Sequence, residues 1–342
     1  MKVGVLTNLN SRKNLGKTQR LPDLPDACCV VRQTRELSEI RPALECFVDS
    51  GCDCWVADGG DGTLHWMLNE GREVLRLKGL WKEGQPFPLV VPSNGGTIDF
   101  VARTAGIKAG TGKIVSLLAD QATRLEDLKT VSLDTVLVRG RVPGDAPGTW
   151  SFERTGFAVA VGGIGQKFFS KYYELPDRNP MGIIDISAKA SIGYIANRLP
   201  AGVGSHVPVK IRDIGTYILS GTPAEVVADG RRFDYGRYQG LHVSSVEIDF
   251  GTMKLFEYAR QPGQLHIVVG TLPMHECAWK WTWYVVGKPI PGKQWHEFPG
   301  KSLQVKAAGG ELLDPVIDGE MFFGYDELDI SLGPAITFPV VS

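Results

Sequence analysis

The chain has 342 residues, a length typical of two domains. Its 37 Lys and Arg against 38 Asp and Glu give a net charge of −1, which excludes the broad basic field of a protein that coats nucleic acid. A hydrophobic fraction of 43% and a charged fraction of 22% exclude wholesale disorder. No apolar run approaches the roughly 18 residues that span a bilayer. We therefore expect a soluble, cytoplasmic chain without a nucleic-acid partner, whose 8 Trp and 41 Gly leave peripheral contact with a membrane open.

The cysteines do not form a recognisable metal site. Five of the six lie within the first 54 residues, and none belongs to a Cys-x-x-Cys pair. A zinc site needs four ligands at a characteristic spacing. We interpret these residues as reduced thiols that act as small apolar side chains, and we predict no metal bound to them.

The first third of the chain alternates short apolar strands with helices. Helical spacing is clear in residues 35–50, where Leu37, Ile40 and Leu44 lie three or four positions apart. The repeated order of strand, glycine-rich loop and helix indicates a doubly wound parallel sheet. Its ligand-binding loops are expected at the carboxyl ends of the strands. The expected strands are residues 2–7, 54–57 and 88–91, and the expected helices are residues 35–50, a segment beginning near 63, 98–105 and 112–128.

The pattern changes near residue 130, where short strand-like segments separated by turn signals begin. This spacing predicts an antiparallel sandwich or barrel. The expected strands are residues 131–138, 150–161, 207–219, 243–250, 265–269, 279–286 and 302–307, and the expected helices are 164–173 and 188–199. We therefore predict an α/β domain in residues 1–129, a β-rich domain in residues 130–325, and C-terminal strands in residues 326–342 that return to the first domain.

The most informative loop is Gly59-Gly60-Asp61-Gly62-Thr63, between a predicted strand and a predicted helix. Glycines let the backbone approach a polyanion closely, and N–H groups at the start of the helix can face phosphates. An acidic residue in such a loop repels bare phosphate, so Asp61 makes chemical sense if it meets Mg²⁺ or takes a proton from an acceptor hydroxyl. The alternative is an ordinary strand-to-helix turn with an aspartate cap.

Other catalytic motifs are absent. The Gly112-Lys113 pair is followed by Ile114, where a P-loop needs Ser or Thr, and no Gly-x-Gly-x-x-Gly follows a strand. His275-Glu276 lacks the second helical histidine of a zinc protease, and there is no Gly-x-Ser-x-Gly nucleophile elbow. The Gly-Gly-Asp loop is therefore the main chemical signal.

Four segments together resemble the diacylglycerol kinase catalytic-domain superfamily, which includes bacterial lipid kinases, sphingosine kinases and ceramide kinases. The loop of residues 59–63 matches the nucleotide-binding signature of that family. Residues 8–11 (Asn-Leu-Asn-Ser) and 92–103 (PSNGGTIDFVAR) resemble its Asn-Pro-x-Ser-Gly and P-x-G-T-x-N-D-F-A-R segments. Residues 316–320 (Val-Ile-Asp-Gly-Glu) match its late Asp-Gly-Glu motif, and residues 263–270 resemble the strand upstream. The likeness runs in order along nearly the whole chain.

The chain departs from the family pattern in two of these segments. Leu9 and Arg12 replace the proline and the glycine of the first loop. Ile98 stands where the family has asparagine, and the Gly-Thr pair is shifted by one residue.

The resemblance implies a first domain like those of phosphofructokinases and NAD kinases, with ATP and Mg²⁺ in a cleft between the two domains. Its implied catalytic residues are Asp61, Asp318 and Glu320, with Asp318 and Glu320 meeting magnesium-bound ATP and either Asp61 or Asp318 as the base. The implied nucleotide-binding residues are Asn8, Asn10, Ser11, Gly59, Gly60, Gly62, Thr63, Asn94, Gly95, Gly96 and Thr97. Lys13, Lys17 and Arg103 are further cations that can offset phosphate charge.

The acceptor site is implied at Asp99 and Asp134, although Asp134 reads equally well as a solvated strand carboxylate. The implied reaction is phosphoryl transfer to the primary hydroxyl of diacylglycerol, ceramide or a sphingoid base. The alternatives are an enzyme specific for ceramide or sphingoid lipids, an NAD kinase-like enzyme, and an inactive lipid- or nucleotide-binding protein. Residues 279–284 alternate Trp with Lys and Thr, which predicts a strand with three Trp on one face, either against a membrane or in a sandwich core.

Overall fold

The structure, a computed structural model, describes residues 1–16, 28–82, 85, 87–120, 128–175, 180–249, 254–285 and 288–341. It divides into two compact units. Unit 1 comprises Met1–Thr135 and Pro334–Ser342, and unit 2 comprises Val136–Gly333. Both divisions fall inside long strands, β5 (Thr130–Arg141) and β19 (Glu327–Pro339).

Unit 1 is built on a four-stranded parallel sheet in the order β2-β1-β3-β4. The strands are β1 (Val3–Asn8), β2 (Cys29–Thr34), β3 (Cys54–Asp58) and β4 (Leu89–Pro92). The two central strands, β1 and β3, are buried almost throughout, which explains their unbroken apolar sequence. The α/β organisation predicted for this part of the chain is confirmed, whereas β2 was not predicted.

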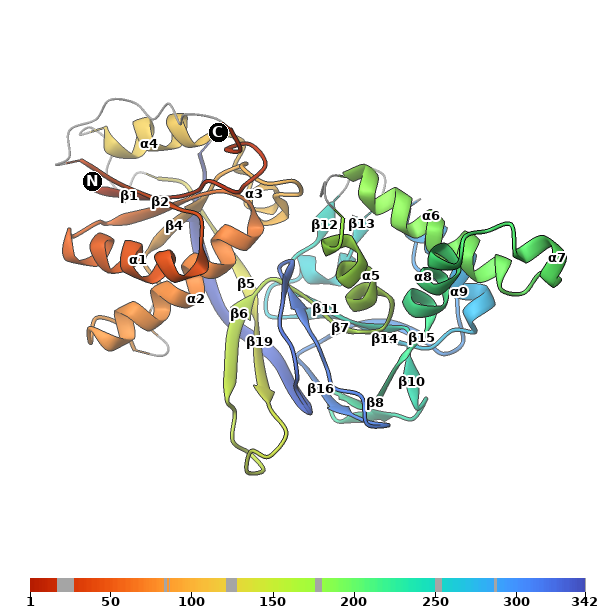
Figure 1. Ribbon diagram of the computed structural model, residues 1–342. Helices are drawn as coiled ribbons and strands as arrows, with labels where there is room; N and C mark the ends of the chain where they lie inside the picture. The colour runs from red at the N-terminus through yellow and green to blue at the C-terminus, as the bar shows by residue number, and fades with distance from the viewer. Residues whose placement is uncertain are drawn as a thin grey trace. The chain divides into compact units, whose positions relative to one another are not determined.

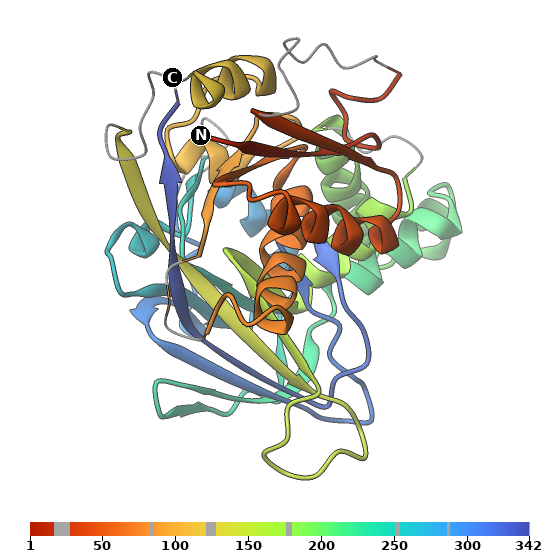
Figure 2. The ribbon, with the colours of Figure 1, turned by 90° about the vertical axis from the view of Figure 1, so that its left-hand side faces the viewer.

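Helices cover both faces of this sheet. Helices α1 (Ile40–Asp49) and α2 (Asp61–Leu77) pack on one face, and α4 (Thr111–Ala119) packs on the other, against β1 and β3 (Figures 1 and 2). A short 3-10 turn, η1 (Leu37–Glu39), precedes α1, and a five-residue helix, α3 (Phe100–Thr104), follows β4. The loops after β1, β3 and β4 therefore all leave the carboxyl edge of the sheet.

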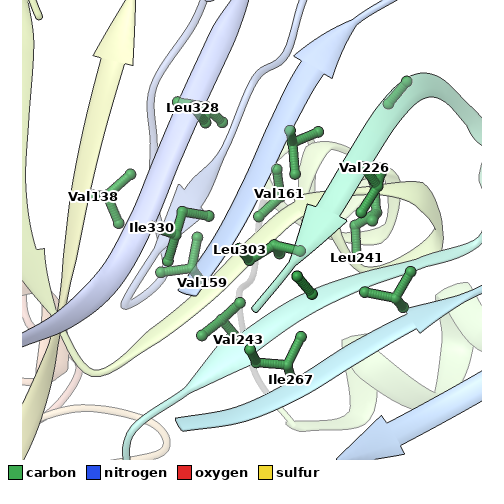
Figure 3. Close-up of a cluster of buried hydrophobic side chains, with 14 of the residues drawn as sticks. Val138, Val159, Val161, Val226, Leu241, Val243, Ile267, Leu303, Leu328 and Ile330 are labelled. Atoms are coloured by element: carbon green, nitrogen blue, oxygen red, sulfur yellow. The ribbon is translucent and has the colours of Figure 1, made fainter. Parts of the chain in front are cut away.

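Unit 2 contains two sheets whose facing side chains form one hydrophobic core. The larger sheet has the order β10-β8-β16-β19-β5-β6, with β9 beside β8, and the smaller has the order β15-β14-β11-β7-β17-β18. Valine, leucine and isoleucine side chains from both sheets, such as Val226, Val243 and Ile330, point toward one another (Figure 3). In the described residues, the strand pairings of the smaller sheet are all antiparallel, as predicted. The bounds are β6 (Phe152–Gly156), β7 (Ala158–Gly162), β8 (Thr222–Ala228), β9 (Arg231–Phe233), β10 (Arg237–Tyr238), β11 (Gly240–Ser244), β14 (Leu265–Gly270), β15 (Trp295–Gly300), β16 (Ser302–Ala307), β17 (Val316–Ile317) and β18 (Glu320–Met321).

Helices pack against the other face of the smaller sheet and form a second apolar cluster with Val268 and Trp295 (Figure 1). They are α5 (Gly163–Tyr173), α6 (Pro180–Ala196), α8 (Val209–Leu219) and α9 (Met274–Val285), whereas the short α7 (Ala201–Gly204) packs against α6. A two-stranded ribbon, β12 (Ile248–Asp249) and β13 (Lys254–Leu255), and a 3-10 turn, η3 (Glu257–Arg260), complete the unit. No helix in the described part of the chain is both long and apolar enough to cross a membrane.

Two predicted strands are in fact helices. Residues 209–219 of the predicted strand 207–219 form α8, because Ile211, Ile214 and Ile218 have helical spacing that outweighs the strand preference of β-branched residues. Residues 279–285 lie in α9, so the tryptophans do not share one face of a strand. Cys277 and Ala278 are buried in α9 while Trp279 is 51% exposed. The alternation of Trp with polar residues therefore does not reflect the two-residue repeat of a strand.

Candidate functional site

Three loops meet at the carboxyl edge of the parallel sheet in unit 1. We name them the β1 loop (residues 8–16), the β3 loop (residues 58–63) and the β4 loop (residues 92–99). Because β1, β3 and β4 are parallel and adjacent, their carboxyl ends lie side by side, where ligands of open α/β sheets bind. Most of the residues predicted to bind a nucleotide lie in these loops.

The β3 and β4 loops pack backbone against backbone through paired glycines. The Gly95 N–H donates to the Gly59 carbonyl oxygen at 3.0 Å. A Cβ on Gly95 would stand 2.6 Å from that oxygen, and a Cβ on Gly60 would stand 2.9 Å from the Gly96 Cα. Any side chain at these positions would force the loops apart, which is the local reason for glycine at both pairs.

Thr63 links the β3 loop to the β1 loop. Its side chain is buried in the first turn of α2, and its Oγ1 accepts a hydrogen bond from Asn8 Nδ2 at 3.0 Å. A Cβ on Gly59 would stand only 2.1 Å from that same Oγ1. Asn8 Oδ1 accepts from the Asn10 N–H at 2.9 Å, and Asn10 Nδ2 donates to the Arg35 carbonyl at 2.7 Å. The two asparagines thus fix the course of the β1 loop.

Asp61 is the first residue of α2, and its carboxylate caps a different helix. Oδ2 accepts from the Phe100 N–H at 3.2 Å and Oδ1 from the Val101 N–H at 3.1 Å, the first two residues of α3. These N–H groups have no partner within α3, so the carboxylate satisfies them and complements the positive end of the helix dipole. Asp61 therefore positions α3, the helix that carries Arg103.

Asp99 closes the β4 loop in a left-handed backbone conformation, with φ of 53°. Its Oδ1 accepts from the Gly96 N–H at 2.8 Å, and burial raises the pKa of its carboxyl above the ordinary value. Lys13 Nζ lies 3.9 Å from Asp99 Oδ2 and also donates to the Asn94 carbonyl, so a cation spans the β1 and β4 loops. Asn94 Nδ2 donates to the Ile107 carbonyl at 3.0 Å. Thr97 is half-buried in the same loop, and Lys17 lies outside the described residues.

Asp58, which was not predicted, lies at the end of β3 and is 2% exposed. Its carboxylate accepts hydrogen bonds from Thr111 Oγ1, from Asn14 Nδ2 at 3.3 Å and from Ser93 Oγ at 3.5 Å. Burial raises the pKa of this carboxyl, and the hydrogen bonds, Thr7 among their donors, act in the opposite direction. Asp58 therefore ties the ends of β1, β3 and β4 to the start of α4. The sequence feature that could have identified Asp58 is a charged residue at the end of a buried strand.

The loops carry polar groups that suit an anion. The first N–H groups of a helix lack intrahelical partners, and α2, with 17 residues, directs its positive end to this edge. Ser11 is 8% exposed, and its Oγ has no hydrogen-bond partner among the described residues. A buried hydroxyl left unsatisfied is destabilising by about 1–3 kcal/mol, so this group is suited to receive a ligand. Among the described residues there is no cluster of three or more His, Cys, Asp or Glu that could hold a metal by itself.

The remaining predicted residues lie elsewhere. Asp134 is half-buried on β5, outside the three loops. Asp318 and Gly319, with φ of 50° and 89°, form the two-residue turn between β17 and β18 in unit 2. Both positive φ values are typical of the hairpin turn in which Asp-Gly is favoured. The Asp318 Oδ1 accepts from the N–H groups of Phe157 and Ala158 at 2.8 and 2.9 Å. Glu320 pairs with Ile317 in the β17–β18 hairpin, and its half-buried side chain forms no hydrogen bond or ion pair with the described residues.

The fold matches solved structures along nearly the whole chain. Three structures of proteins from Bacillus anthracis str. Sterne share 15%, 16% and 15% sequence identity with it, at TM-scores of 0.54, 0.59 and 0.56. Each comparison covers 99% of this chain and 97% of the other. One is described as a diacylglycerol kinase, and the other two carry that assignment provisionally.

No protein-family model and no curated protein matches the sequence. The structural likeness is therefore the independent support for the resemblance drawn from the motifs. The chain has the diacylglycerol kinase fold over nearly its whole length.

Proposed function

We propose that the protein is a lipid kinase that transfers the γ-phosphoryl group of ATP to the primary hydroxyl of diacylglycerol, ceramide or a sphingoid base. The observation that carries the proposal is the packing of Gly59-Gly60 on Gly95-Gly96 at the start of α2. This packing fixes the two loops at the amino end of α2, where helix N–H groups favour a polyanion, and the β1 loop adds the buried Ser11 hydroxyl. Among the three acceptors we favour diacylglycerol, because a solved structure with the same fold is named a diacylglycerol kinase.

The residues of unit 1 divide the work of binding phosphates. The N–H groups of the β3 loop and of the first turn of α2 bind phosphate oxygens, Ser11 donates its hydroxyl, and Lys13 offsets negative charge. Bound to the ATP phosphates, Mg²⁺ supplies charge neutralisation during transfer. We propose that Mg²⁺ arrives with the nucleotide, bound to its phosphates.

We assign the base and the metal contacts to the carboxylates of the two recognised motifs. A carboxylate offers about four lone-pair sites, so Asp61 can cap α3 and still meet Mg²⁺ or the acceptor hydroxyl. Asp318 remains the other candidate base. We assign Glu320 to magnesium binding on the basis of the Asp-Gly-Glu motif that it shares with Asp318.

A second candidate function follows from the same carboxylates. Asp61 and Asp318 each accept two backbone N–H groups, which is sufficient reason for an aspartate at both positions. A protein that binds a nucleotide or lipid without transferring phosphate would keep both residues for this structural purpose.

The decisive assay offers labelled ATP and Mg²⁺ with diacylglycerol, sphingosine, ceramide and NAD to the full chain. Transfer to one of the lipids supports the proposal, and the accepted lipid decides between diacylglycerol and a ceramide or sphingoid specificity. Transfer to NAD alone would establish the NAD kinase-like alternative. ATP binding without any transfer would establish the binding protein. Asp61→Asn should abolish transfer, whereas Asp49→Asn, at an exposed carboxylate on α1, should leave it unchanged.

We also propose peripheral membrane contact through the helices of unit 2. Large apolar side chains are exposed on helices that pack against one another, α6 with α7, α8 and α9. Helix α6 is rich in apolar residues, and its Asp185 and Lys189 form an ion pair on its surface. The exposed residues are Met181, Ile184, Ile192, Ile195, Leu199, Val203, Val209 and Trp279.

Vesicle sedimentation tests this surface. Ile195→Glu with Val203→Glu should weaken binding to phospholipid vesicles, because a charge opposes burial in the headgroup region. Leu312→Glu, at a comparably exposed leucine outside these helices, is the control. Equal binding by the two variants would remove α6 and α7 from membrane contact.

A further inference from the structure

Unit 2 contains a cavity of about 470 Å³ that the proposed kinase reaction does not use. Its inner wall comes from β14 and β15, and its rim comes from β13, η3 and residues 288–290. On these strands His266, Trp295 and Glu297 alternate with residues of the core between the sheets, so they point to the face that the helices cover. The volume is within the range of small-molecule sites, about 300–1,000 Å³.

His266 places a hydrogen-bond donor without a partner in this cavity. The side chain is 2% exposed, and its Nδ1 accepts the Tyr258 N–H at 3.2 Å. The neutral imidazole therefore carries its proton on Nε2. This Nε2 has no hydrogen-bond partner among the described residues, and the Glu297 Oε2 lies 3.5 Å away. The pair is too far apart for a good hydrogen bond, and a buried donor left in this way is destabilising.

Glu297 is held in place from its other side. Its Oε1 accepts from Trp295 Nε1 at 2.8 Å. The indole ring fits because β11 and β14 carry glycine beneath it: a Cβ would stand 2.5 Å from the ring at Gly240 and 2.6 Å at Gly270. The Glu297 Oε2 and the His266 Nε2 are thus held 3.5 Å apart before any ligand binds.

Aromatic rings and one strained residue complete the inner wall. The ring centroids of Phe256 and Tyr258 lie 5.3 and 5.1 Å from that of His266. Phe256 has φ of 66°, a left-handed conformation that is costly for a bulky residue and is often kept where a ligand is bound. The wall therefore offers apolar faces beside a donor and an acceptor.

A hydroxyl group complements the donor and acceptor best. It accepts from Nε2–H of His266 and donates to the Glu297 carboxylate at the same time. An anionic oxygen at this point would be repelled by Glu297, and an ammonium group could not accept from His266. The aromatic faces suit the C–H surface of a carbon skeleton that carries such hydroxyls.

The rim adds positive charge. Lys254 and Lys288 are exposed there, and neither forms an ion pair within the described residues. Arg260 is paired with Glu247, while Glu257 is exposed at the same rim. The two lysines thus provide a position for a phosphate at the mouth, away from the carboxylate of Glu297.

We propose that this cavity binds a phosphorylated polyol, with a ring hydroxyl between His266 and Glu297 and the phosphate at Lys254 and Lys288. The same chemistry is presented by a free sugar or inositol phosphate and by the headgroup of a glycerophospholipid such as phosphatidylinositol. The proposal is independent of the kinase reaction.

Calorimetric titration of the full chain with myo-inositol 1-phosphate tests the proposal, with myo-inositol and inorganic phosphate as the two partial ligands. We expect the phosphorylated polyol to bind at least about tenfold more tightly than either part.

Lys254→Ala with Lys288→Ala should remove most of that advantage, whereas Lys306→Ala, at an exposed lysine on β16, should not. Glu297→Gln keeps an oxygen for Trp295 Nε1 and should weaken binding of the polyol but not of inorganic phosphate. Equal affinity for inorganic phosphate and inositol phosphate would overturn the proposal.

Vesicles of phosphatidylcholine with and without phosphatidylinositol distinguish the two sources. Binding enhanced by phosphatidylinositol and lost in the Lys254→Ala, Lys288→Ala variant identifies a lipid headgroup. Binding of the free compound alone identifies a soluble ligand. If neither the free compound nor the lipid binds to the folded chain, the cavity is not a polyol phosphate site.

Discussion

Gly95 lies directly against Gly59, with the Gly95 N–H donating to the Gly59 carbonyl at 3.0 Å and no room for a Cβ between them. Gly95→Ala should therefore separate the β3 and β4 loops. Overpacking of this kind is destabilising by about 1–3 kcal/mol, and we expect ATP affinity to fall with it. Urea unfolding and calorimetric ATP titration measure the two effects.

Gly110→Ala is the matched control for that substitution. A Cβ on Gly110 meets nothing within 4 Å, although this residue also precedes a helix in unit 1. Its effect on stability should stay within about 0.5 kcal/mol. If Gly95→Ala behaves like Gly110→Ala in both measurements, the packing of the two loops is not important for binding.

Asp61 allows its structural and chemical roles to be separated. Asp61→Ala removes the cap of α3 and should lower the free energy of unfolding by about 0.5–2 kcal/mol. Asp61→Asn keeps a capping oxygen and should lose much less stability, yet it should abolish phosphoryl transfer. A fully active Asp61→Asn enzyme would limit Asp61 to capping.

We expect His242 to make the folded protein less stable in acid. It lies on β11 beneath α5, where a Cβ on Gly165 would stand 2.3 Å from its ring, and desolvation lowers its pKa to about 4. In the unfolded chain the pKa is the ordinary 6.5. Between these values the unfolded state binds the extra proton, so stability falls as the pH drops from 6.5 toward 4, by about 3 kcal/mol in all. His242→Gln should make the free energy of unfolding less dependent on pH over this window, as urea unfolding at pH 7 and pH 5 would show.

We expect Asp58 to give the stability of the folded protein a pH dependence of the opposite sign. Burial raises its pKa, so the folded state binds the extra proton above the ordinary value of 3.8, and this contribution to stability declines as the pH rises through that window. Asp58→Asn should remove the slope, and Asp58→Ala should also leave the donors from Thr111, Asn14 and Ser93 unsatisfied. We expect the alanine variant to lose about 1–3 kcal/mol, measured by urea unfolding. Identical pH profiles for wild type and Asp58→Asn would contradict this assignment.

The first half of the fold was predictable because its signals are local. The apolar runs of β1 and β3 and the helical spacing of Leu37, Ile40 and Leu44 each lie within a few residues. Helices α8 and α9 were wrongly predicted as strands, because β-branched and aromatic residues favour strands locally while tertiary packing decides the outcome. The glycines of α6 and α8 show this packing: a Cβ on Gly193 would stand 1.9 Å from the Ile211 carbonyl oxygen.

The contacts within the candidate site could not be predicted from local sequence. The glycine loops were recognisable from sequence, but the capping of α3 by Asp61 joins residues 39 and 40 positions apart. No local pattern announces such a contact. The same holds for the cavity in unit 2, where His266 and Glu297 come together only through the register of β14 and β15.

Transfer of label from γ-labelled ATP to diacylglycerol by the full chain, in the presence of Mg²⁺, tests the proposed lipid kinase activity most directly. We predict a labelled phosphorylated lipid with the wild-type protein and none with Asp61→Asn of equal stability. Absence of labelled lipid with diacylglycerol, ceramide and sphingosine alike, from a folded protein that binds ATP, would contradict it.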